Sequence, residues 1–167
     1  GRSALAERFG EALLNRLEQR RFKSKPGECL SLERLGESPS TLLLIGLGEP
    51  AGFGGEQLRA AAAAACKAAA AAGASNLGLA LPLEGLEPAA AAAAAAEAAR
   101  LSVYADQRFK GEADPAPSLD SVTLLGLPAA SEPIARAAVD AAPAICSGVE
   151  LARELVAAPP NVVTPQA

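Results

Sequence analysis

The residues Thr41-Leu-Leu-Leu-Ile-Gly-Leu-Gly48 contain an unbroken apolar run, and a glycine-rich segment continues from them as far as Gly55. A short apolar run of this kind is typical of a strand that is covered on both faces, as in a parallel sheet. An alanine-rich helix is predicted next, over residues 56–72, and Gly73 occupies the position that commonly ends a helix. A strand, a glycine-rich connection and a helix in this order predict an α/β fold.

The rest of the chain continues the alternation of strands and helices, as the spacing of its apolar residues indicates. The predicted elements are, in chain order, a helix over residues 4–20, strands over 29–35 and 41–46, a helix over 56–72, a strand over 76–81, a helix over 88–104, a strand over 121–125 and a helix from residue 131. Pro143 should kink the last helix or split it in two. This order predicts a mostly parallel sheet flanked by helices, with right-handed crossovers.

The composition excludes several classes of function for this chain. Its 167 residues, 50% of them hydrophobic and 20% charged, are typical of one globular domain. Because the sequence contains no histidine, it cannot supply a Ser-His-Asp triad, a Cys-His pair or an imidazole metal site. A net charge of −4 argues against general binding to nucleic acid or to anionic membranes. The alanine tracts, interrupted by Lys67 and Glu97, are too short to span a bilayer.

Two segments have features of a phosphate-binding site. Residues 46–51 match the G-x-G-x-x-[GA] pattern of dinucleotide-binding loops. However, Pro50 has no amide to offer, and the acidic residue Glu84 lies farther on than the expected distance of about 20 residues, so a flexible connection between strand and helix is the preferred interpretation. A basic cluster could also bind phosphate, but favourable placement of cations at a helix C-terminus explains it better. The cluster comprises Arg20, Arg21, Lys23 and Lys25.

The carboxylates and thiols do not form a recognisable site. Glu150 and Glu154 are four residues apart on one helix face and could share a metal ion, but Arg153 lies between them, which favours a solvated face. The three cysteines are far apart and lack a C-x-x-C pattern, so we expect small buried thiols in a reducing compartment. These cysteines are Cys29, Cys66 and Cys146. We assign no catalytic, cofactor-binding or metal-binding residue to this chain.

The stretch GVELARELVAAPPNVVTP, at residues 148–165, resembles the segment that joins the two domains of leucyl (cytosol) aminopeptidases, the M17 family of metallopeptidases. The upstream order is also similar to that family, with FKSKPGE at residues 22–28 followed by LLLIGLG at residues 42–48. Residues 101–110 resemble a further region of the family more loosely. Ala157 stands where the family usually has asparagine.

The resemblance implies a three-layer, macro-domain-like α/β N-terminal domain over residues 1–158. Residues 159–167 would begin the linker to a C-terminal catalytic domain, and the family's first strand would precede residue 1. Thr164-Pro165 is also a typical start of a helix, because a hydroxyl cap is followed by proline. We therefore expect this chain to be a piece of a longer protein.

The same resemblance implies the activity of that longer protein. It would be a hexamer located in the cytoplasm or in a plastid. It would use two divalent metal ions, manganese or zinc, to release N-terminal amino acids from peptides. The family's catalytic residues would all lie beyond residue 167, so we predict that this chain alone is inactive and serves assembly and access to the active sites. Two alternatives stay open: a non-catalytic interaction subunit, and a stand-alone macro-like module that binds a nucleotide or ADP-ribose at residues 46–55.

Overall fold

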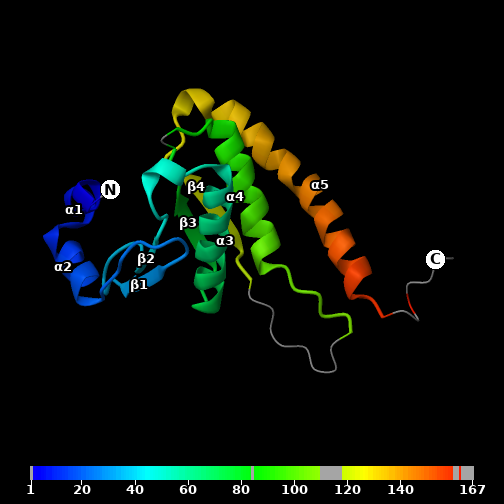
Figure 1. Cartoon of the computed structure of the whole chain (residues 1–167), viewed down its shortest axis with the longest axis horizontal. Helices are drawn as coiled ribbons and strands as arrows, with labels where there is room; N and C mark the ends of the chain where they lie inside the picture. The colour runs from blue at the N-terminus through cyan, green and yellow to red at the C-terminus, as the bar shows by residue number, and fades with distance from the viewer. Residues whose placement is uncertain (1, 84, 110–117, 160–161, 163–167) are drawn as a thin grey trace.

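The computed structural model describes residues 2–83, 85–109, 118–159 and 162, and Figure 1 shows the arrangement of its helices and strands. The elements are α1 (Arg2–Phe9), α2 (Glu11–Gln19), β1 (Cys29–Glu33), β2 (Thr41–Ile45), the 3-10 helix η1 (Pro50–Gly52), α3 (Gly55–Ala71), β3 (Asn76–Ala80), α4 (Pro88–Val103), β4 (Ser121–Leu125), the 3-10 helix η2 (Ala129–Ser131) and α5 (Glu132–Ala157). The predicted order of strands and helices is confirmed, and Gly73 follows the end of α3, where its N–H donates to the Ala70 carbonyl (3.0 Å).

The described strands form two separate two-stranded sheets instead of one mostly parallel sheet. β3 and β4 are parallel, as predicted, with Gly78 opposite Thr123. β1 and β2 are antiparallel, with Leu32 opposite Leu42, so the prediction of a parallel strand at Thr41–Ile45 is wrong. The reason is the short connection between β1 and β2, because a parallel pair needs a long crossover such as the one that contains α4.

Two helices also differ from the predicted pattern. The helix predicted over residues 4–20 is broken at Gly10, which has φ +81°, a conformation that glycine adopts without a steric penalty. In contrast, α5 is one helix that continues through Pro143, so the alternative that Pro143 splits the helix is wrong, and a kink at Pro143 stays a prediction. Pro143 is exposed, so water can hydrate the carbonyl that loses its helical N–H partner.

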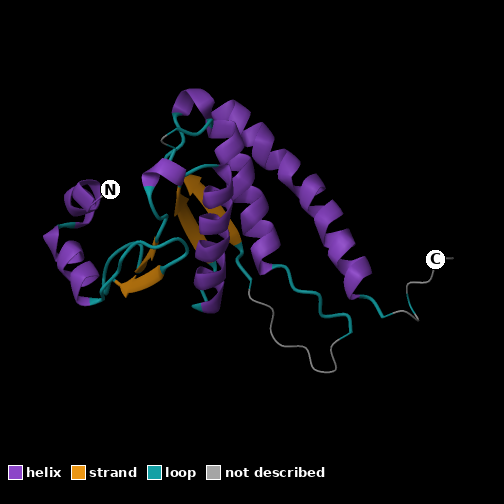
Figure 2. Cartoon of the chain, in the orientation of Figure 1, coloured by secondary structure: helices purple, strands orange, loops and turns teal. Residues whose placement is uncertain are grey.

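Helices α3 and α4 pack against each other and against the β3–β4 sheet, and α5 packs along α4, as Figures 1 and 2 show. The core between them is built mostly of alanine, whose small side chain lets helix backbones approach closely but buries little area. The buried members of this core are Leu58, Ala62, Leu81, Ala91, Ala94, Ala95 and Ala98.

Within the described part of the chain, helices cover only one of the two faces of the β3–β4 sheet. Every second residue of β3 and of β4 is exposed, and the residues between them are half-buried. The described residues therefore do not supply the second helical layer of the expected three-layer fold. No helix among them is both long enough and apolar enough to cross a membrane.

Candidate functional site

The glycine-rich segment after β2 packs directly against the loop that follows α2. The Gly46 N–H donates to the Glu28 carbonyl (2.7 Å), and the Gly48 N–H donates to the Ser24 carbonyl (2.9 Å). A Cβ atom on Gly46 would lie 2.1 Å from the Lys25 carbonyl oxygen, so the close approach of two backbones requires glycine here. These two amides are engaged within the fold, and a phosphate could not use them in this conformation.

The loop between α2 and β1 is organised around the carboxylate of Glu28. Its Oε2 accepts hydrogen bonds from the backbone N–H groups of Lys23 and Lys25, both at 3.0 Å. The side chains of the basic cluster are exposed just beyond the end of α2, in agreement with their interpretation as cations at a helix C-terminus. The stretches FKSKPGE and LLLIGLG, both of which resemble the family, therefore contact each other.

A second group of polar contacts joins α5 to α4 and to the segment that follows α4, and we call it the α4–α5 seam. It comprises Arg100, Leu101, Tyr104, Asp106, Arg108, Glu150, Arg153 and Glu154. Glu150 accepts two hydrogen bonds from Arg100, from Nε to Oε1 (2.7 Å) and from Nη2 to Oε2 (2.8 Å). Glu154, one turn later, accepts a hydrogen bond from the Tyr104 hydroxyl (3.1 Å). A bidentate arginine–carboxylate pair fixes orientation as well as distance, so the seam holds α5 in a defined rotation about its axis.

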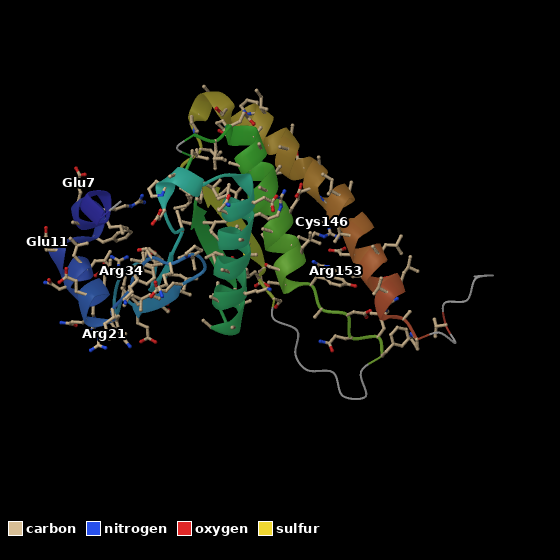
Figure 3. All side chains as sticks on the ribbon, viewed as in Figure 1. Glu7, Glu11, Arg21, Arg34, Cys146 and Arg153 are labelled. Carbon is tan, nitrogen blue, oxygen red and sulfur yellow. The ribbon has the colours of Figure 1, made fainter. Side chains whose placement is uncertain are left out.

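Two further arginines extend the seam. Arg153, labelled in Figure 3, donates from Nη1 to the Leu101 carbonyl (3.0 Å), and its guanidinium lies 5.9 Å from the centre of the Tyr104 ring. Arg108 donates from Nε to Asp106 (3.0 Å) and from Nη2 to the Glu154 carbonyl (3.1 Å). The C-terminal half of α5 is therefore fixed to α4 and to residues 104–108 by several independent contacts.

The seam changes the interpretation of Glu150 and Glu154. Both carboxylates are half-buried and paired, so the preferred prediction of a solvated face is wrong. The alternative of a shared metal is not supported either, because each carboxylate faces its own partner on the neighbouring segment. In the ranges that the structure describes, no three His, Cys, Asp or Glu side chains are grouped so that they could hold a metal ion.

Arg108 controls the ionisation of Asp106. Hydrogen bonds from the side chain and the backbone N–H of Arg108 lower the pKa of Asp106 to about 2. This pair therefore stabilises the folded chain above the ordinary aspartate pKa of about 3.9, and its contribution is lost as the pH falls through about 2. We expect Arg108→Gln to raise the Asp106 midpoint toward the ordinary value in a carboxyl-carbon NMR titration. The matched control is Arg136→Gln, because Arg136 pairs with Glu132 on α5, and an equal shift in both variants would contradict the assignment.

The cysteines agree with the sequence prediction at two of three positions. Cys66 and Cys146 are buried, whereas Cys29, the first residue of β1, is exposed, which corrects the expectation of three buried thiols. Figure 3 shows Cys146 on α5, where its Sγ lies 3.9 Å from the Glu97 carbonyl of α4. Burial raises the pKa of the Cys146 thiol, which is the opposite of what a nucleophile requires.

Sequence reasoning missed the α4 side of the seam. Arg100 and Tyr104 are four residues apart, as are their partners Glu150 and Glu154, so the two spacings match. This matched spacing is the signal that could have indicated the contact between the two segments. The structure thus defines a class of protein: a small α/β domain in which a group of polar side chains fixes α5 to α4 and to residues 104–108.

Comparison with known proteins identifies the family. The model of the cytosol aminopeptidase family, N-terminal domain, matches residues 1–113. Curated relatives include the probable cytosol aminopeptidases of Parasynechococcus marenigrum, 53% identical over 152 residues, and of a Synechococcus strain, 47% identical over 165 residues. These alignments cover 90% and 99% of this chain but only 30% and 32% of the relatives, so the chain spans about a third of their length.

Solved structures agree with this match. A tomato leucine aminopeptidase mutant superposes with a TM-score of 0.80 and 31% identity over 98% of this chain and 32% of its own. The bottromycin maturation enzyme BotP, solved in complex with Mn, has a TM-score of 0.71 and 28% identity over 90% of this chain and 30% of its own. The chain belongs to the cytosol aminopeptidase family, and it corresponds to the N-terminal domain of that family.

Proposed function

We propose that this chain is the non-catalytic N-terminal domain of a leucyl aminopeptidase, in which it serves assembly and shapes access to the active sites. The parent enzyme releases N-terminal amino acids from peptides and acts as a cytoplasmic hexamer. In it, this domain takes the three-layer, macro-domain-like form, completed by other residues of the parent enzyme. The observation that carries the proposal is the superposition with tomato leucine aminopeptidase, which extends over 98% of this chain at a TM-score of 0.80.

The contacts of the described side chains support a parent enzyme in which catalysis belongs to a second domain. The parent enzyme would use two divalent metals, manganese or zinc, and the related BotP was solved in complex with Mn. The seam carboxylates of this chain do not fit that role, because arginine or tyrosine side chains already bind them. We therefore place the metal ligands and the catalytic residues in the C-terminal domain of the parent enzyme.

Activity measurements on two proteins test the proposal. We expect the full-length native gene product to hydrolyse leucine p-nitroanilide with manganese or zinc, and the purified 167-residue chain to be inactive under the same conditions. Metal-dependent hydrolysis by the 167-residue chain alone would overturn the proposal. An inactive full-length product would favour the interaction subunit instead.

The nucleotide-binding alternative has a separate test. Since the Gly46 and Gly48 amides donate to backbone carbonyls, we expect calorimetry with ADP-ribose or NAD to show no binding up to millimolar ligand. Micromolar binding would favour the stand-alone module. The substitution Gly48→Val is not a clean control for this experiment, because a Cβ atom at Gly48 would lie 2.8 Å from the Pro26 ring.

A further inference from the structure

The outer side of α5 presents a continuous apolar surface, which we call the α5 face. It comprises Ile134, Ala141, Ile145, Gly148, Ala152, Leu155 and Val156, all of which are exposed. Ile134, Ile145 and Val156 are eleven residues apart, close to three helical turns, so they lie on one line along the helix. Their exposed fractions are 64%, 53% and 88%. Single exposed aliphatic residues are ordinary, but a contiguous apolar patch of this kind marks a contact surface.

The fold does not allow the α5 face to turn inward. An adjacent side of the helix, about 100° around its axis from the α5 face, buries Ala135, Ala142 and Cys146. Along the C-terminal half, the seam fixes the rotation of the helix through the Arg100–Glu150 and Tyr104–Glu154 contacts. Rotating the α5 face into the core would break these hydrogen bonds and would expose the buried residues.

The α5 face also lacks charge, and this indicates the chemistry of what covers it. Within Glu132–Ala157, all of which the structure describes, the charged residues lie away from the line through Ile134, Ile145 and Val156. Arg136 and Asp140 project to one flank of this line, and Glu150 and Arg153 take part in the seam on the other. The partner surface must therefore be apolar and closely fitting, with small side chains at Ala141, Gly148 and Ala152 permitting a close approach.

We propose that the α5 face is the surface on which the C-terminal domain of the same parent chain docks. This inference rests on the proposed function, in which that domain exists. The family match is to an N-terminal domain, and this chain spans about a third of its relatives, so most of each relative follows the region that contains α5. The α5 face extends to Val156, next to the last residue of the helix. A domain tethered there has an effective concentration on the order of millimolar, which favours it over a free second copy.

Cysteine labelling in the full-length enzyme tests whether the α5 face is covered. In a Cys29→Ser background, which removes the exposed thiol of the N-terminal domain, Ala152→Cys places a probe on the face, five turns from Ile134, and peptide mapping reads the labelling at this position. Asp140→Cys is the matched control, because Asp140 is an exposed residue of the same helix that lies off the face. We expect a maleimide to label the Ala152→Cys variant at least ten-fold more slowly than the Asp140→Cys variant. Equal labelling rates would overturn the proposal.

A photocrosslinker attached to the same engineered thiol identifies what covers the α5 face. We expect a cross-link to the C-terminal domain at the mass of a single chain. A cross-linked product with the mass of two chains would show that a second copy covers the face, and it would overturn the proposal. Leucine p-nitroanilide hydrolysis, measured on each preparation, separates this inference from the proposed function. An active enzyme with an accessible α5 face refutes only the docking, whereas an inactive protein with a covered face refutes only the function.

Discussion

Replacing Gly46 with alanine is expected to lower the free energy of unfolding of the 167-residue chain by roughly 3 kcal/mol or more, at or above the upper end of typical overpacking effects. The added Cβ atom would lie 2.1 Å from the Lys25 carbonyl oxygen and 2.6 Å from the Ser24 carbonyl carbon. Both are backbone atoms, so no rotamer change can relieve the clash. The loop and the end of β2 would have to separate, and the hydrogen bonds from Gly46 to Glu28 (2.7 Å) and from Gly27 to Gly46 (2.9 Å) would weaken.

Urea unfolding of the chain measures this effect, with Gly55→Ala as the matched control. Gly55 is the first residue of α3, and a Cβ atom built on it meets nothing within 4 Å. The same chemical change at Gly55 should therefore be neutral or stabilise the chain by about 0.5 kcal/mol, because alanine restricts the unfolded chain and favours helix. If the two variants have equal stability, the backbone contact at Gly46 is not formed in solution.

Predictions that depend only on neighbouring residues were correct, whereas those that depend on how elements pair or break were not. Residues 56–72 and Gly73 contain both the helix and its end, so α3 was predictable from neighbouring residues alone. The apolar run at Thr41–Ile45 reports burial, but strand direction depends on the length of the connection to β1. Likewise, apolar residues continue at four-residue spacing across Gly10, from Leu5 and Phe9 to Leu13 and Leu17, so apolar periodicity cannot show that Gly10 separates α1 from α2.

The contacts of the candidate site were less predictable because they join residues about fifty positions apart. Glu150 and Glu154 are predictable as a pair on one helix face, but the matching spacing of Arg100 and Tyr104 lies fifty residues away, and residues near the two glutamates do not point to it. The apolar residues of α5 posed a related problem. Their helical spacing can be read from the sequence. However, α5 has one apolar stripe that is buried and one that is exposed, both at helical spacing, and only the packing of α5 on α4 shows which stripe is which.

Replacing Ala95 with leucine is expected to lower the free energy of unfolding by about 2–3 kcal/mol, which is within the usual range for overpacking. Ala95 is fully buried in the alanine core, in the same cluster as Leu58 and Ala62 of α3. The three added carbon atoms would have to be accommodated between helices whose close approach depends on methyl side chains. Since protein interiors are densely packed, this extra volume must push α3 and α4 apart or force a strained rotamer.

The matched control for Ala95→Leu is Ala90→Leu, one and a half turns earlier on α4, where the side chain is exposed. Alanine and leucine have similar helix propensities, so this variant should unfold within about 0.5 kcal/mol of the wild type. Thermal and urea unfolding of both variants give the comparison. A stability loss at Ala90 equal to that at Ala95 would mean that the loss at Ala95 does not come from overpacking of the alanine core. No loss of stability at Ala95 would mean that α3 and α4 can separate freely. Since α5 packs on α4, the α5 face would then lack the rigid support that a docking surface needs.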